Sequence, residues 1–115
     1  MKTLQVLFPG LCLAVVIAAG CSKNKSRTRT PVTHKVVISG MKFHPATLTV
    51  AKGDTVIWIN KDIVTHNVTA YPDSEWTSGP MAKGVSWKKV ANKSFKYFCS
   101  IHPAMKGKIK VAKGK

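Results

Sequence analysis

The chain has 115 residues, with 19 Lys plus Arg against 4 Asp plus Glu, and a formal net charge of +15. A chain of this length forms one domain with one modest hydrophobic core, which excludes a large enzyme that carries its own cofactor domain. Since 44% of the residues are hydrophobic and 8% are aromatic, the composition also excludes a chain that is disordered throughout.

The first 20 residues have the features of a cleaved signal peptide. Lys2 gives a basic start, and an apolar run follows over residues 4–19, shorter than a membrane-spanning helix requires. The small residues Ala18-Ala19-Gly20 then precede Cys21, an arrangement that resembles a bacterial lipobox, in which the Cys receives lipid and becomes the mature N-terminus. Ordinary signal-peptidase cleavage nearby is the alternative. Both interpretations predict export, and the first predicts a lipoprotein anchored through Cys21 in the bacterial periplasm or cell envelope.

Residues 21–33 are basic and contain no apolar run, so we expect a flexible tether that ends near Pro31; a disordered leader is the alternative. A lipid together with basic residues would give two membrane-binding signals, which stable anchoring favours. Cys12 is removed with the signal peptide, and Cys99 is then the only thiol of the folded domain, so no disulfide is expected within it.

Residues 34–115 show the pattern of short strands separated by Gly and Pro. Segment 55–60 is β-branched and aromatic on both faces, as in a buried central strand. About seven to eight strands in some 80 residues, without sustained helical spacing, predict an all-β sandwich. We also expect the protein to be a monomer. The sequence leaves open whether Trp76 and Trp87 belong to the core. The expected strands are 36–38, 48–50, 55–60, 66–69, 86–90, 95–99 and 109–111.

Three residues with metal-binding side chains recur at intervals of three near the C-terminus: Cys99, His102 and Met105. In a continuing strand, residues three apart point to opposite faces, so the chain must turn after Cys99 for the three side chains to converge. Pro103 and Gly107 supply residues that favour such a turn. We therefore expect a strand end that leads into a tight loop.

One thiolate, one imidazole and one thioether favour copper, because thioether is a poor ligand for zinc. A trigonal set of two His and one Cys with a distant Met is the pattern of a blue-copper site. That pattern needs a second His. His66 is the candidate, since it follows the long apolar strand and a loop.

With these pieces in place, residues 34–112 resemble the cupredoxin (type 1 blue copper) family, most closely its amicyanin and plastocyanin members. The short gap between His102 and Met105 is similar to the amicyanin loop. The resemblance implies a Greek-key β-sandwich. The matching pieces are Phe43-His44-Pro45, Gly53 to Asn60, His66-Asn67-Val68, Gly79-Pro80-Met81 and Cys99-x-x-His102-x-x-Met105.

The resemblance also implies the roles of the site residues. His66, Cys99 and His102 would be the equatorial ligands of one copper ion, and Met105 its weak axial ligand. A pair of residues beside the ligands, Asn67 and Ser100, would hold the site rigid. The exposed edge of His102 would be the electron port. We expect an apolar ring around that edge formed by Pro80, Met81, Pro103 and Ala104.

These expectations favour a small electron carrier, with the copper ion cycling between Cu(I) and Cu(II), over an enzyme. A copper-trafficking or copper-sensing protein without an electron-shuttle role is the alternative. A domain of a copper oxidase or reductase would need a second copper site with His-x-His pairs, which the sequence does not contain. A nucleophilic pair of Cys99 and His102 lacks a motif for the third residue that would orient it.

Residues 34–115 contain 14 basic and 4 acidic residues, a net charge of 14 − 4 = +10. This charge favours redox partner proteins with an acidic docking face. Nucleic acid is not expected, because the chain is predicted to be exported and has no aromatic-basic RNA-binding motif. Solubility or affinity for anionic head groups is the alternative explanation of the charge.

Overall fold

The computed structural model describes residues 28–113 together with Gly10 and Gly20, so the predicted signal peptide, apart from these two glycines, and the predicted lipidation site Cys21 lie outside the described residues. Within the described part, no helix is long and apolar enough to cross a bilayer. Eight strands form the domain: β1 (Thr33–Ser39), β2 (Lys42–His44), β3 (Thr47–Ala51), β4 (Asp54–Asn60), β5 (Thr69–Ala70), β6 (Ser86–Ala91), β7 (Phe95–Phe98) and β8 (Lys106–Ala112).

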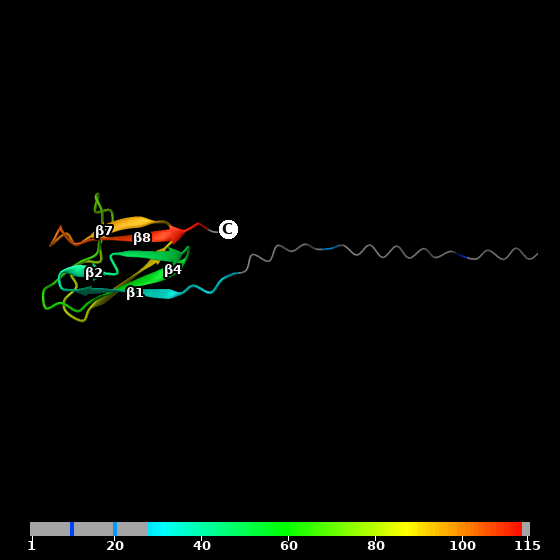
Figure 1. The fold of residues 1–115 in the computed structure, drawn as a ribbon. Helices are drawn as coiled ribbons and strands as arrows, with labels where there is room; N and C mark the ends of the chain where they lie inside the picture. The colour runs from blue at the N-terminus through cyan, green and yellow to red at the C-terminus, as the bar shows by residue number, and fades with distance from the viewer. Residues whose placement is uncertain (1–9, 11–19, 21–27, 114–115) are drawn as a thin grey trace, which may run out of the picture.

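The strands form two four-stranded sheets packed face to face, which confirms the predicted β-sandwich (Figure 1). One sheet has the order β2-β1-β4-β6 and the other β3-β8-β7-β5. Both sheets are mixed, because β1 pairs with β4 in parallel and β3 pairs with β8 in parallel. Gly53, with a φ of 90°, makes the turn by which the chain passes from β3 in one sheet to β4 in the other.

β4 is the central strand that the sequence predicts. Its alternate residues Val56 and Trp58 are fully buried, and the residues between them are half-buried because β1 and β6 flank the strand on both sides. Burial of these side chains between the sheets is the main favourable contribution to folding. The buried core draws on both sheets: Val36, Ile38, Phe43, Val50, Val56, Trp58, Val68, Met81, Ala91, Tyr97, Cys99, Met105 and Ile109.

A buried carboxylate, Asp54, holds the segment before β1 against the start of β4. Asp54 accepts hydrogen bonds from the Val32 amide at 2.9 Å, from His34 Nε2 at 2.7 Å and from the Arg29 guanidinium at 2.9 Å. These donors, the Val32 amide first, hold the pKa of Asp54 well below its usual range. The end of the predicted tether is therefore fastened to the domain, and β1 begins at Thr33.

The predicted strand over residues 66–69 is shorter and lies later, as Thr69–Ala70. The backbone of His66 pairs instead with Met81 in the long connection after β5, with N···O distances of 3.1 and 2.8 Å in the two directions. Met81 is therefore 1% exposed, and its predicted place in an exposed apolar ring is wrong. Pro80 and Met81 are consecutive, but only Pro80 faces solvent.

Gly107 of β8 lies opposite Tyr97 of β7, and a Cβ atom at position 107 would lie 2.2 Å from Tyr97 Cζ. We expect Gly107→Ala to lower the free energy of unfolding by about 1–3 kcal/mol, because the buried ring must shift. Denaturant titration followed by tryptophan fluorescence measures this loss. Lys110→Ala on the same strand, at an exposed position, is the matched control and should change stability by less than about 0.5 kcal/mol. Equal stability of the two variants would contradict the packing described here.

Candidate metal centre

The segment after β7 turns as the sequence predicts. Three backbone hydrogen bonds close it: His102 N–H donates to the Cys99 carbonyl at 3.1 Å, Met105 N–H to the His102 carbonyl at 2.9 Å, and Cys99 N–H to the Met105 carbonyl at 3.0 Å. The third bond returns the chain to its starting point, so the loop is compact before β8 begins. Figure 1 shows this loop in orange, at the end of the sandwich opposite the start of β1.

His66, 33 residues before Cys99 in the sequence, joins the two donors of this loop. The Nδ1 atoms of His66 and His102 each lie 3.8 Å from Cys99 Sγ. One ligand atom from each of the three residues lies within 4.8 Å of the others, and in the described part of the chain this is the one such cluster of His, Cys and acidic residues. His66 and Cys99 are fully buried, while His102 is half-buried.

Met105 closes the loop and is 5% exposed. It lines a surface cavity of about 560 Å³ together with His102, Met41 and Phe43. The cavity therefore borders the side of the cluster where the Met105 thioether and the His102 ring are found. His34 and His44 do not belong to the cluster. His34 bonds Asp54, and His44, which lines the same cavity, bonds the Ser39 carbonyl at 2.9 Å.

Asn67 links the two halves of the site. Its Nδ2 donates to Ser100 Oγ at 2.7 Å, and its Oδ1 accepts from the Ser100 amide at 2.8 Å. The backbone N–H of Asn67 donates a hydrogen bond to Cys99 Sγ at 3.4 Å, and this bond stabilises negative charge on the sulfur. Asn67 and Ser100 therefore fix the His66 segment and the Cys99 loop relative to one another.

Asp62 is a functional residue that sequence reasoning missed. Its Oδ2 accepts a hydrogen bond from His66 Nε2 at 2.8 Å, and its two oxygens also accept from the Gly40 and Met41 amides at 2.8 and 3.0 Å. These bonds, the one from Met41 first, lower the pKa of Asp62. An available signal was its position, since Asp62 is one of only four acidic residues and stands four residues before His66.

The donor set fits a copper ion. The bond to Asp62 places the proton of His66 on Nε2, so the Nδ1 lone pair faces the Cys99 sulfur. A thiolate and two imidazole nitrogens that converge at these distances, with a thioether at the end of the same loop, match copper better than zinc. No carboxylate oxygen belongs to the cluster, and Asp62 acts through His66.

Comparison with known proteins agrees with this chemistry. The model of the copper-binding plastocyanin/azurin family matches residues 30–112. Amicyanin from Paracoccus versutus is 32% identical over an alignment 129 positions long, which covers 95% of this chain and 98% of that protein.

Among solved structures, a reduced amicyanin variant superposes with a TM-score of 0.62 at 31% identity, covering 70% of this chain and 82% of that one. A copper-containing nitrite reductase from Thermus scotoductus has a TM-score of 0.64 at 27% identity, but the match covers 75% of this chain and only 23% of the reductase. The match to the reductase is thus to one part of a much longer chain.

The family model covers most of the chain, the relative spans nearly its whole length, and the fold and donor set agree with both. This chain belongs to the plastocyanin/azurin family of copper-binding proteins, the cupredoxins, and copper is its cofactor.

Proposed function

We propose that the protein is an exported one-electron carrier in which His66, Cys99 and His102 are the equatorial ligands of one copper ion and Met105 is the weak axial ligand. The observation that carries the proposal is the convergence of both Nδ1 atoms on Cys99 Sγ, at 3.8 Å each, within a hydrogen-bonded pair of loops. When bound, the copper ion supplies the one-electron chemistry by alternating between Cu(I) and Cu(II). The chain supplies position, charge and access.

Rigidity is the first contribution of the chain. Asp62 holds the His66 ring, the Asn67 amide holds the Cys99 sulfur, and three backbone bonds hold the loop from Cys99 to Met105. Ligands fixed in this way move little when the charge of the site changes, so little energy is spent on rearrangement in each transfer. Such a site suits an electron carrier better than a carrier of the ion itself, which must release its cargo.

Access is the second contribution. His102 is the one half-buried member of the three-residue cluster, and it shares a surface cavity with Met41 and Ala104. Met41 in this cavity is 42% exposed, and Ile101, the residue before His102, is 49% exposed, so this edge of the site offers exposed apolar side chains. Apolar contact surface at the one accessible ligand allows a partner to approach closely and exclude water. We assign the electron port to this edge.

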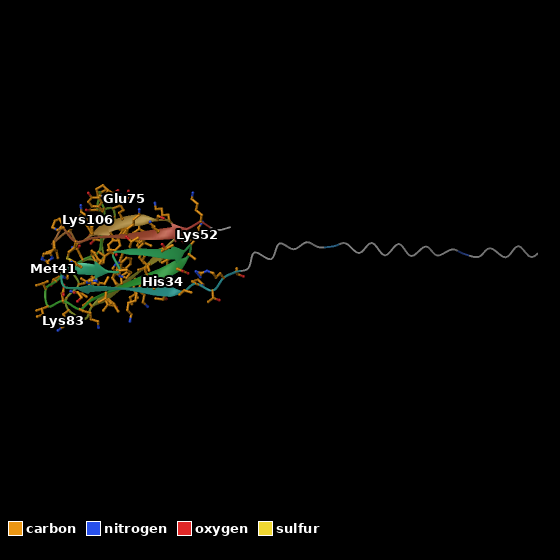
Figure 2. The ribbon with its side chains drawn as sticks, viewed as in Figure 1. His34, Met41, Lys52, Glu75, Lys83 and Lys106 are labelled. Carbon is orange, nitrogen blue, oxygen red and sulfur yellow. The ribbon has the colours of Figure 1, made fainter. Side chains whose placement is uncertain are left out.

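The charge around the port supports a partner with an acidic docking face. Lys42 and Lys106 line the cavity that borders His102, and Figure 2 shows Lys83 and Lys106 toward the same end of the domain. A basic field of this kind raises the rate of encounter with acidic partners and weakens as salt is added. The copper-trafficking alternative has less support, because Met41 is the only exposed Met among residues 28–113.

Export through a signal peptide over residues 1–20, and anchoring through lipid on Cys21, complete the proposal. The support is the small-residue run before Cys21 in the sequence. An electron carrier anchored in this way would serve partners in the cell envelope.

The first test replaces the thiolate. Cys99→Ser should abolish the intense thiolate-to-copper absorption band of the Cu(II) protein and leave a folded β domain, because the hydroxyl is a hard, weak donor. Absorption and circular dichroism spectra measure the two outcomes. Cys21→Ser, which replaces the other cysteine of the proposed mature protein, is the matched control and should keep the band. A coloured Cys99→Ser protein would overturn the ligand set.

The second test separates the carrier from a trafficking protein. An electron carrier should show reversible voltammetry and fast electron exchange between its Cu(I) and Cu(II) forms. It should also keep its copper when a chelator is added. Slow exchange combined with ready transfer of copper to an acceptor protein would favour the trafficking alternative.

The third test concerns Asp62. Asp62→Ala should weaken Cu(II) binding by about 10–100-fold, because loss of the partner that orients a ligating His has this typical cost. Competition with a chelator of known affinity measures the change. Asp73→Ala removes an exposed carboxylate in the connection after β5, and this control should bind copper as the wild type does. Wild-type affinity in Asp62→Ala would show that the contact with His66 has no role in the site.

The fourth test concerns location. Cys21→Ala should convert a membrane-associated protein into a soluble exported protein, because a lipid chain can no longer be attached. Fractionation of cells and mass measurement of the mature N-terminus report this change. If the wild-type protein fractionates as soluble with an unmodified N-terminus, the lipoprotein proposal is wrong, while the copper site is unaffected.

A further inference from the structure

A row of aromatic side chains crosses the domain from the surface to the strand that leads into Cys99. Trp76 stacks on Trp87, with ring centroids 5.8 Å apart and planes at 23°. Trp87 lies 5.5 Å from Trp58, its partner across the β4–β6 pair, and Trp58 lies 5.3 Å from Tyr97. Tyr97 and Cys99 are two residues apart and both fully buried, so they share the inner face of the chain. The ring contacts are therefore continuous from Trp76 to Tyr97, which stands two residues before Cys99.

The outer end of this row of aromatic side chains is accessible. Half-buried Trp76 lines a surface cavity of about 360 Å³ that Lys52 and Lys93 also line. Figure 2 labels two of the lining residues, Lys52 and Glu75. The Lys89 ammonium lies 4.5 Å from the centroid of the Trp76 ring. Three lysines against one glutamate attract small anions to the cavity.

The order of side chains also suits the movement of an electron. When no proton leaves with the electron, indole loses one electron more easily than phenol or a benzene ring does. The rate of electron transfer falls steeply with distance, so transfer between rings in contact is fast. The Lys89 cation over Trp76 makes a positive hole there less stable than a hole farther inside, on Trp87 or Trp58. The electrostatics therefore favour transfer of a hole inward.

The inner end of the row of aromatic side chains offers no residue that would retain such a positive hole. Trp58 Nε1 and the Tyr97 hydroxyl have no hydrogen-bond partner among the described residues. A tyrosine that loses an electron must also release its proton, so without an acceptor Tyr97 bridges Trp58 and Cys99 and does not retain the hole.

We propose that four aromatic side chains form a second electron route, separate from the His102 port: Trp76, Trp87, Trp58 and Tyr97. This route delivers electrons from the reduced centre to Trp76 at the surface. There a small anionic one-electron oxidant, such as the carbonate radical anion, attacks the indole. This inference rests on the proposed copper site. The oxidant gains one electron from Trp76 and a proton from water, and leaves as bicarbonate. Trp76 regains an electron through Trp87, Trp58 and Tyr97. A copper ion held by His66, Cys99 and His102 would supply that electron, since one-electron chemistry is what such an ion contributes. No covalent bond in the protein forms or breaks.

Pulse radiolysis with carbonate radicals tests the route on the full chain. Before any pulse, the thiolate-to-copper band of the Cu(II) protein must be present, since its absence would refute the proposed function and not this route. In the Cu(I) protein we expect the tryptophan-radical absorption to decay as the thiolate-to-copper band grows, at a rate independent of protein concentration. In copper-free protein the radical should persist, and mass spectrometry should find more oxidised Trp76. Equal decay with and without copper would overturn the inference.

Trp87→Phe removes the middle indole and keeps an aromatic ring for packing. We expect the first-order transfer to slow by an order of magnitude or more, with the copper band unchanged. Tyr71→Phe is the matched control and should leave the rate unchanged. Tyr71 is an exposed phenol that packs on Phe98 and does not belong to the row of aromatic side chains. If Trp87→Phe folds poorly, half-buried Trp76→Phe serves instead, and its radical yield at the cavity should fall. Wild-type transfer in the folded variant would show that the rings only pack.

Discussion

The sulfur of Cys99 is the point on which the functional end of the domain depends. It lies 3.8 Å from two imidazole nitrogens and accepts a hydrogen bond from the Asn67 amide. All three partners come from loops, but Cys99 itself directly follows β7, a strand in the middle of a sheet. Because β7 is paired on both edges, the sulfur has a fixed position, and the loops can be arranged around it.

The ligand residues could be predicted from the sequence because their chemistry and their spacing are both local. Cys99, His102 and Met105 lie within seven residues, and only a tight loop brings such side chains together. The strands were predictable for a similar reason, since alternation of buried and exposed residues is a property of each segment alone. Segment 55–60 was predictable from composition instead, because its residues are β-branched and aromatic on both faces.

Other features depend on contacts between distant segments, which no local pattern encodes. The parallel pairing of β1 with β4 and of β3 with β8 is one example, because alternation predicts a strand without predicting its partner. The burial of Met81 is another, since it follows from pairing with His66, 15 residues earlier in the chain. Asp62 was missed because an acidic loop residue is ordinarily solvated, and its role appears only when the Gly40–Met41 turn lies beside it.

The Asp54 contacts at the other end of the domain have a consequence for reach. Because Arg29 bonds to Asp54, the proposed lipid anchor at Cys21 would be separated from this contact by only the seven residues between Cys21 and Arg29. Fully extended, seven residues span about 25 Å. The start of β1 and the end of β8 lie at this same end in Figure 1, opposite the metal-binding loops. With lipid on Cys21 as proposed, a domain tethered so closely at this end would hold its metal-binding loops away from the lipid surface, where partners could approach from the aqueous side.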